Sequence, residues 1–527
     1  MNKNILSLCL AVSPLALSAW NVGTAPEPSR ALIEEYTGIH CPNCPDGHAV
    51  AAQLMGLHPG DVYSVAIHAG SYADAKGTEP DFTTELGEML NTYFEIPYYP
   101  CGVVNRSSGP ASRTSWGDFC RGVLARTSPV NLWTSSEYDP ASRTLTLEVE
   151  GYFTSAMSDP RLNVFLLQSE ILGPQSGGQL GVEYPHRHML RDRLSSADFG
   201  DTLDAKGEGE YFTKTYTYIM PADFKGVATD PVNMSLMVFV TEGEGEVAQV
   251  TEEHLHHPDF IPSLSVEAKA APIAIGSNYA FDYVDMMVYN HGGVEVENVS
   301  FDLTLNGDKQ TVVWSGSIPG HSAQVVKIPL DGSWAGAVDE ENNSYIIRMM
   351  KVNGQEVESP SVRGSFNEIG SFPADLTLRI KTDSHAADNA WRILDTDGET
   401  VAEFGPYAEG VVEEYENHVQ LVPGEVYCLE VTDAWGDGVV APAGYVKLYD
   451  KEGKQVGQYR EIRGYGLRQF FRAVDTDGVT LTGADPCGGT DAYFDLSGRR
   501  VGEEASGVLI RRSTDASGNA VYTKIIK

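Results

Sequence analysis

Ala31-Leu-Ile-Glu-Glu-Tyr-Thr37 is followed closely by Cys41-Pro42-Asn43-Cys44, and this stretch decides the fold expected for the N-terminal part of the chain. The first segment is apolar enough for a strand, and the Cys-x-x-Cys pair opens a helix. Helix amides and the positive end of the helix dipole stabilise a thiolate on Cys41. Cys44, one turn further on, is placed to close a disulfide. The stretch therefore predicts a dithiol redox site.

Two other interpretations of the Cys-x-x-Cys pair give different functions. A zinc site needs a second Cys-x-x-Cys or a histidine pair at matching spacing, and the sequence holds no second Cys-x-x-Cys. A purely structural disulfide stays open, although so short a loop adds little stability through chain entropy.

The N-terminus predicts export. Residues 1–19 combine Lys3 with an apolar run from Ile5 to Leu17 and then Ser18 and Ala19, which is typical of a cleaved signal peptide. No later stretch approaches the roughly 18 uninterrupted apolar residues of a membrane-spanning helix. We therefore expect an exported chain with no transmembrane span after cleavage.

Six cysteines remain once the signal peptide, with Cys9, is removed. An even number suits an oxidising compartment, and six cysteines allow fifteen pairings. Sequence proximity predicts three disulfides: Cys41–Cys44, Cys101–Cys120 and Cys428–Cys487.

The net charge of the chain excludes some classes of binding partner. The formal net charge is −36, with 73 acidic against 37 basic residues among 527. Such a surface repels nucleic acid and anionic membranes, so neither is an expected partner.

The spacing of apolar residues along the chain predicts several domains. Apolar residues at helical spacing, such as Leu86 and Leu90, alternate with strands up to Ser128, whereas period-two strands and Asn-Gly turns dominate from Pro129 onward. The expected domains are an α/β domain at 20–128, a β-sandwich at 129–262, an immunoglobulin-like β-sandwich at 263–368, a further β domain at 369–474, and a linker with a C-terminal tail at 475–527.

Three motifs resemble one exported family. Arg30-Ala-Leu-Ile-Glu-Glu-Tyr-Thr-Gly-Ile-His-Cys-Pro-Asn-Cys-Pro-Asp-Gly-His48 resembles the signature of proteins related to the twenty-eight-kilodalton outer-membrane protein. Tyr99-Pro-Cys-Gly-Val-Val-Asn-Arg106 and Tyr184-Pro-His-Arg-His-Met-Leu-Arg191 are similar to two further segments of that family. The resemblance covers about residues 28–255. It implies a thioredoxin-like domain followed by a β-sandwich, at the outer membrane, on the cell surface or secreted.

Pro100 occupies the place of the thioredoxin cis-proline, whose loop lies against the dithiol and presents backbone groups to a bound peptide. Only an X-Pro bond populates cis at low cost, which agrees with that role. A trans turn proline is the alternative. Cys101 is either a third redox thiol or, as predicted from export, half of a bridge to Cys120.

The C-terminus resembles a short, degenerate type IX secretion sorting domain. The resemblance rests on Ala492-Tyr-Phe-Asp-Leu-Ser-Gly-Arg-Arg-Val501, Gly507–Ile510 and Thr523–Lys527. It implies transport across the outer membrane and attachment to the surface. A terminal β-hairpin is the alternative.

Metal sites have weaker support. Asp433-Ala-Trp-Gly-Asp437-Gly resembles a turn of exported jelly-roll modules, so we describe 369–474 as jelly-roll-like. The two carboxylates of this turn, Asp433 and Asp437, predict a calcium site. The alternative is that the glycines simply serve a tight turn. Histidines are a second candidate set, and surface or hydrogen-bonded roles are the alternative for them. These are His186, His188, His254, His256 and His257.

Two functional hypotheses remain. In the first, the protein is a thiol-disulfide oxidoreductase acting on protein disulfides: Cys41 attacks, Cys44 resolves, Pro100 holds the substrate, and no cofactor is needed. Glu34 or Glu35 would accept a proton, and strand alternation aims only one of them inward. In the second, the protein is a surface adhesion or binding protein whose Cys-x-x-Cys is an inert structural disulfide.

Overall fold

The structure is a computed structural model. It describes residues 20–178, 181–260, 264–270, 283–329, 343–357, 359, 361–366, 370–435, 438–439, 444–460, 462, 466–475, 492–494, 500–501, 508–514 and 520–526. The predicted signal peptide at 1–19, Asp437 and Cys487 lie outside these residues.

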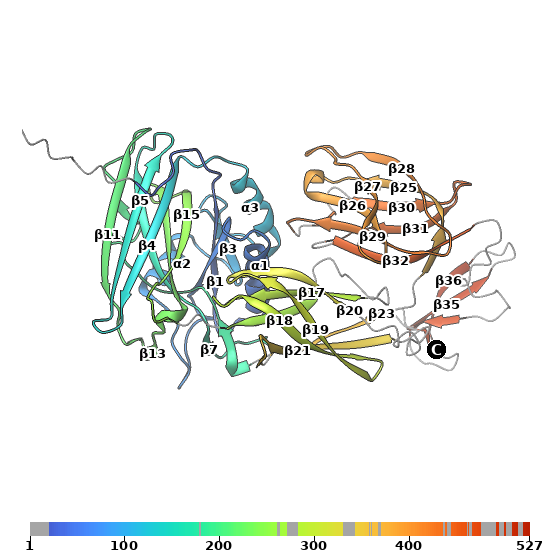
Figure 1. Cartoon of the computed structure of the whole chain (residues 1–527), viewed down its shortest axis with the longest axis horizontal. Helices are drawn as coiled ribbons and strands as arrows, with labels where there is room; N and C mark the ends of the chain where they lie inside the picture. Colours follow the sequence, from blue (N-terminus) through green and yellow to red (C-terminus); the bar gives the residue numbers. More distant parts are fainter. Residues whose placement is uncertain are drawn as a thin grey trace, which may run out of the picture.

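An eight-stranded sheet organises the N-terminal half of the chain (Figure 1). Its strands, in spatial order, are β15 (Val247–His254), β14 (Met234–Glu242), β6 (Pro160–Gln168), β9 (Met189–Arg193), β2 (Val62–His68), β1 (Ala31–Thr37) and β3 (Cys101–Val104), with β10 (Asp201–Thr202) paired to β6. The helices are α1 (Cys44–Leu57), α2 (Glu85–Tyr93) and α3 (Trp116–Leu124). β1 runs parallel to β2 and antiparallel to β3. The strands and helices expected around the Cys-x-x-Cys pair are confirmed.

The two faces of this sheet are covered by different elements. Leu32 and Tyr36 of β1 pack in a core cluster with Leu90 of α2, whereas Ala31 and Ile33 pack in a cluster with α1 and α3. Because successive strand residues point to opposite faces, β1 separates an α2 side from an α1 side.

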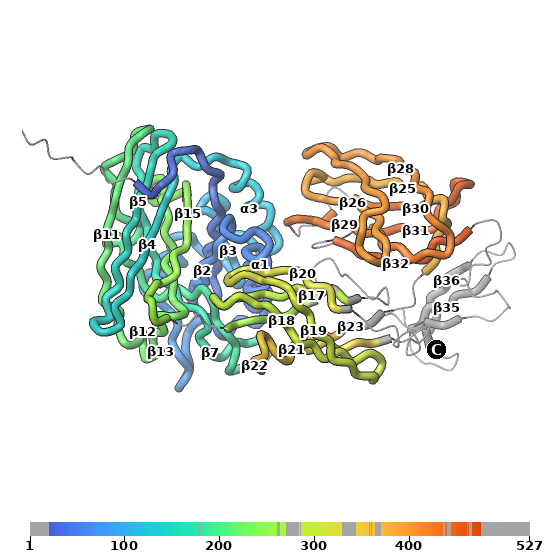
Figure 2. Tube along the Cα trace, in the orientation of Figure 1, coloured from blue at the N-terminus to red at the C-terminus, as the bar shows by residue number. Residues whose placement is uncertain are grey.

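The sheet continues across the boundary predicted at 128/129. β6 and β14 are apolar on both faces: Val164 and Val238 pack toward the second sheet, and Phe165 and Phe239 pack in the same cluster as Leu32. A strand that is buried on both faces packs against a layer on each side, so β6 and β14 connect the second sheet to the layer that contains α2. The first two predicted domains therefore share one sheet and the core cluster that contains Leu32 and Phe165, and Figure 2 shows their trace as a single body.

A second, three-stranded sheet stacks on β6 and β14 and closes the expected sandwich. Its strands are β11 (Tyr211–Ile219), β5 (Thr144–Phe153) and β4 (Val130–Asp139). Two short ribbons accompany it: β7 (Ile171–Gly173) with β8 (Tyr184–His186), and β12 (Asp223–Phe224) with β13 (Val227–Ala228). The β7–β8 ribbon becomes important at the dithiol.

Two further β units follow, each made of two sheets around its own apolar cluster. The third unit contains β16 (Val266–Ala270), β17 (Tyr283–Asn290) and β20 (Ser322–Pro329), facing β19 (Asp308–Ile318), β18 (Val296–Leu305), β21 (Asn343–Val352), β22 (Gln355–Glu356) and β23 (Val362–Phe366). The fourth contains β24 (Gly370–Pro373), β32 (Gly466–Val474), β29 (Val426–Asp433), β26 (Asn389–Leu394) and β27 (Thr400–Phe404), facing β28 (Glu414–Gln420), β25 (Asp375–Lys381), β30 (Tyr445–Tyr449) and β31 (Gln455–Arg460).

The C-terminal tail forms a small antiparallel sheet. Its strands are β34 (Arg500–Val501), β33 (Ala492–Phe494), β35 (Val508–Thr514) and β36 (Ala520–Ile526). The chain is thus mostly β and built from several sheets, as predicted.

Candidate dithiol site

Cys41 and Cys44 form a disulfide at the start of α1, with their Cα atoms 5.4 Å apart. α1 begins at Cys44, and the chain enters it from β1 through a short loop. Pro45 and Asp46 lie in the first turn of the helix. Proline loses no intrahelical hydrogen bond there and a carboxylate suits the positive end of the dipole, so both residues favour a helix start.

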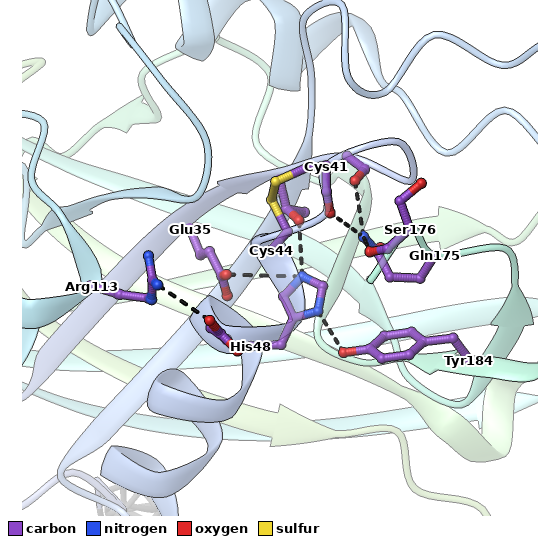
Figure 3. The surroundings of a disulfide bond; sticks show 11 residues. Glu35, Cys41, Cys44, His48, Arg113, Gln175, Ser176 and Tyr184 are labelled. Atoms are coloured by element: carbon purple, nitrogen blue, oxygen red, sulfur yellow. Dashed lines mark hydrogen bonds and ion pairs between the residues drawn. A yellow bond between two sulfur atoms is a disulfide. The ribbon is translucent and has the colours of Figure 1, made fainter. Parts of the chain in front are cut away.

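The disulfide is withdrawn from solvent: Cys41 is 1% and Cys44 0% exposed. Pro174–Gly178, which we call the strap, follows β7 in the β7–β8 ribbon, and Figure 3 shows its residues Gln175 and Ser176 beside Cys41. The Gln175 Nε2 amide donates to the carbonyl oxygens of Gly38 (3.2 Å) and Cys41 (3.0 Å). The Ser176 amide donates to Ile39 O at 2.8 Å. Sequence reasoning missed the strap.

Glu34 and Glu35 have different surroundings because they point to opposite faces of β1. Glu34 is fully buried on the α2 side and pairs with Arg106, whose Nε and Nη2 donate at 2.9 and 2.8 Å. Glu35 lies on the α1 side: a Cβ built on Gly47 would come within 2.4 Å of its Oε1. Of the two carboxylates, Glu35 is therefore the one beneath the dithiol helix.

Burial raises the pKa of Glu35 well above its usual value, and the nearby Arg113 only partly opposes this shift. Among the described residues, the buried Oε1 atom has no hydrogen-bond partner. A carboxyl group in such a place binds and releases its proton closer to neutral pH than an exposed one.

His48 of α1 lies between this carboxyl group and Tyr184 of β8. Its Nε2 lies 2.9 Å from Thr37 Oγ1 and 3.9 Å from Glu35 Oε1, and its Nδ1 lies 2.8 Å from the Tyr184 hydroxyl (Figure 3). Burial, reinforced by the nearby His186, lowers the pKa of His48 to about 3, so the ring is neutral at physiological pH. His48 and Tyr184 both stood in the quoted motifs, but spacing gave no role for either.

A cavity of about 480 Å³ adjoins these side chains. Glu35, His48 and Tyr184 line it together with Glu267 and Lys269 of the third unit. The side chains beneath the dithiol thus face a cavity that the third unit also lines, whereas the strap contacts the backbone of the Cys-x-x-Cys loop.

Pro100 packs against the same helix. The Tyr99–Pro100 bond is cis, and a Cβ built on Gly47 would lie 2.8 Å from Pro100 Cβ. The structure therefore brings Pro100 and Glu35 to the first turns of α1, next to the Cys-x-x-Cys segment.

Cys101 and Cys120 are free, fully buried thiols, so the predicted disulfide between them is wrong. Cys101 pairs with Tyr36 across β1 and β3 and shares the α2 face of the sheet, whereas Cys120 of α3 packs in the cluster on the other face. Burial raises the pKa of Cys101 to about 11 and of Cys120 to about 12. Closeness in sequence failed because a sheet separates the two sulfurs.

Cys428 is also a free, buried thiol, which corrects the predicted Cys428–Cys487 pair; Cys487 itself lies outside the described residues. The side chain of Cys428 packs with Leu394 and Phe470 inside the fourth unit. An apolar enclosure of this kind suits a small hydrophobic side chain.

The candidate metal residues have other partners. The Asp433 carboxylate accepts hydrogen bonds from the amides of Trp435 (2.7 Å) and Gly438 (2.5 Å), while Asp437 lies outside the described residues. Calcium at these two residues therefore stays a prediction. His186 faces the carbonyl oxygen of Pro174 at 3.3 Å, and His188 lies 3.8 Å from Glu252. Within the described residues, no group of three or more ligating side chains is arranged to hold a metal ion.

Comparison with known proteins supports the resemblance. Residues 88–258 match the sequence model of outer membrane protein Omp28. Over this segment the chain is similar to the Omp28 family. It contains the Tyr99–Arg106 and Tyr184–Arg191 motifs, whereas the Cys-x-x-Cys stretch precedes it. The Omp28 match supports the predicted location at the outer membrane or cell surface.

Solved structures give weaker likenesses. HBP35 of Porphyromonas gingivalis is 18% identical, with 64% of this chain and 98% of that chain covered and a TM-score of 0.35. A protein from Agrobacterium tumefaciens is 13% identical, with 45% and 99% covered and a TM-score of 0.30. No curated protein matches the chain. None of the helices in the described part of the chain is long and apolar enough to cross a membrane.

Proposed function

We propose that the N-terminal α/β part of this Omp28-related protein is a thioredoxin-like unit that exchanges disulfides with protein substrates outside the cytoplasm. The observation that carries the proposal is the Cys41–Cys44 disulfide at the start of α1, with Glu35 and Pro100 packed against the first turns of that helix. A helix start lowers the pKa of a preceding cysteine, and a buried carboxyl group supplies a proton acceptor.

The exchange proceeds in two displacements. The Cys41 thiolate of the reduced protein attacks one sulfur of a substrate disulfide, which forms a mixed disulfide and releases one substrate thiolate. The Cys44 thiolate then attacks Cys41 Sγ, which closes the protein disulfide and releases the second substrate thiolate. Two electrons pass to the substrate, and an external dithiol restores the reduced protein.

Glu35 takes the proton of the resolving thiol in this scheme. The carboxyl group lies against Gly47 in the helix that Cys44 begins, and burial raises its pKa well above the usual value. A base with such a pKa can accept the Cys44 proton and return it in the next cycle.

Insulin-disulfide reduction with an external dithiol tests the proposal. We expect Cys41→Ser to abolish turnover, and Cys41 to be alkylated faster than Cys44 after reduction. Cys428→Ser is the matched control, because it removes a buried thiol in another unit and should leave turnover intact. An inactive native protein whose Cys41–Cys44 pair has a reduction potential below about −300 mV contradicts the proposal.

A surface binding function is the second candidate, and the burial of the disulfide beneath the strap favours it. In this alternative the α/β part is a scaffold, and the third and fourth β units contact a partner. A redox titration of the Cys41–Cys44 pair distinguishes disulfide exchange from surface binding. If no cellular dithiol reduces the disulfide, the β units are the functional part of the protein.

We also propose that the tail at 475–527 directs type IX export. The antiparallel pairing of β33 with β35 and of β35 with β36 gives it a small sheet of its own, as a recognition domain needs. Deletion of the tail should leave the protein in the periplasm during cell fractionation, whereas unchanged surface exposure favours the simple hairpin alternative.

A further inference from the structure

The strap is held from both ends of its hairpin. β7 and β8 pair through Ile171–His186 and Gly173–Tyr184, and His186 Nε2 lies 3.3 Å from Pro174 O. Tyr184 then contacts His48 of α1. The ribbon is thus anchored on the dithiol helix while its tip rests on the Cys-x-x-Cys loop.

The tip fits closely against that loop. Gly177 has φ = +76°, and a Cβ added there would come within 2.0 Å of Pro42 O. Positive φ and the close approach both require glycine. Within the tip, Gln175 is buried at 4% exposed, whereas Ser176 and Gly177 are exposed to solvent.

Exchange is incompatible with this closed position. A thiolate must approach a disulfide sulfur directly, and its rate depends on access to that sulfur. Both sulfurs belong to residues that are at most 1% exposed. Part of the surrounding structure must therefore move before a thiol reaches Cys41, and the strap is a segment that is hydrogen-bonded to the Cys-x-x-Cys loop itself.

We propose that the strap is a built-in cover that competes with substrate for the Cys-x-x-Cys loop, so that its hydrogen bonds set the rate of exchange. This regulation rests on the proposed function. The strap is a polypeptide segment whose donors occupy the carbonyl oxygens of Gly38, Ile39 and Cys41. A protein substrate that supplies donors to the same three oxygens would take its place.

Gln175→Glu tests the cover with almost no change in size. A carboxylate cannot donate to the carbonyl groups that Gln175 Nε2 now contacts, so the closed strap is destabilised. Gln168→Glu is the matched control: Gln168 is equally buried at 4%, and its amide donates to Ala228 O in another part of the sheet.

The measurement is the rate at which dithiothreitol reduces the Cys41–Cys44 disulfide, followed by alkylation and mass spectrometry. One dithiothreitol thiolate attacks a protein sulfur, its second thiolate closes the oxidised ring, and both cysteines are released as thiols. The buried thiols of Cys101, Cys120 and Cys428 report global unfolding in the same samples, because they are labelled only when the protein opens.

We expect Gln175→Glu to raise the rate about tenfold while these three thiols stay unlabelled, and a larger gain with a protein reductant than with dithiothreitol. Gln168→Glu should leave the rate within about twofold of the native protein. Equal rates for the native protein and Gln175→Glu, or acceleration that appears together with labelling of Cys120, overturn the cover.

Insulin turnover distinguishes failure of the cover from failure of the proposed function. A faster dithiothreitol reaction without insulin turnover supports the cover and contradicts disulfide exchange as the function. Insulin turnover combined with a dithiothreitol rate that Gln175→Glu does not change supports disulfide exchange as the function and contradicts the cover.

Discussion

Glu35 Oε1 lies 3.9 Å from His48 Nε2, and the two side chains are 2% and 17% exposed. Burial raises the pKa of the acid and lowers that of the imidazole, so both groups favour their neutral forms. A neutral pair avoids the desolvation cost of a buried ion pair and leaves the carboxyl group free to exchange a proton.

Glu35→Gln should therefore stabilise the protein increasingly as the pH rises. The unfolded chain loses the Glu35 proton near its ordinary pKa of 4.5, whereas the folded chain retains it to higher pH. Above that point the folded state binds more protons than the unfolded state, so stability falls with pH, by up to about 1.4 kcal/mol per unit. Glutamine removes this loss. Urea unfolding at several pH values checks the slope, with the exposed Glu137→Gln as control.

The same substitution should lower insulin reduction at pH 7 by roughly 100-fold, within the range typical of a lost proton acceptor. Greater stability combined with lower activity separates a functional carboxyl group from a structural one. Unchanged turnover would assign Glu35 to packing alone.

Arg106→Met should destabilise the protein by about 3–5 kcal/mol, because it leaves Glu34 buried without its ion-pair partner. Both side chains are fully buried, and the guanidinium lies 5.1 Å from the centre of the Phe239 ring. The double variant Glu34→Leu, Arg106→Met should regain most of the loss. Thermal or urea unfolding of the full cycle checks this, and additive losses would mean that the two groups do not act as a pair.

Local pattern was enough for the helices and for the Cys-x-x-Cys disulfide, because their signals are spacing and composition within a few residues. The shared sheet was not predictable, because the apolar sequence of β6 is the same whether its second face packs on another sandwich layer or on α2. The strap depends on a hydrogen bond between Gln175 and Cys41, which are 134 residues apart. Gln175 carried no signal because a buried glutamine in a turn looks like any loop residue.

The corrected cysteine pairing gives a direct chemical prediction. Alkylation of the denatured but unreduced protein should label Cys101, Cys120 and Cys428, while Cys41 and Cys44 stay protected until reduction. Under native conditions the three free thiols should react at least 100-fold more slowly than a peptide thiol, because burial raises the pKa of each. Peptide mapping that finds Cys101 joined to Cys120 would restore the original pairing.

Trp435 of the fourth unit contacts the end of α1, the helix that begins at Cys44. Its ring stacks on His58 at the end of α1, with centroids 4.1 Å apart and planes 13° apart, and His58 Nε2 lies 3.2 Å from Ala434 O. A second link joins Arg121 of α3 to Asp388 at 2.5 Å. The turn that Asp433 shapes thus contacts the end of α1 and links the fourth unit to it.

Trp435→Ala should release this contact and raise the pKa of His58, which burial now holds below its usual value. The stacked pair contributes roughly 1 kcal/mol, so the domains should separate more readily without unfolding. Histidine titration by NMR checks the shift, and limited proteolysis near residue 369 checks the separation. Trp314→Ala, which removes a half-buried tryptophan from the third unit, should change neither. A His58 pKa that does not move in Trp435→Ala would show that the imidazole is buried by other groups and that Trp435 does not hold the two units together.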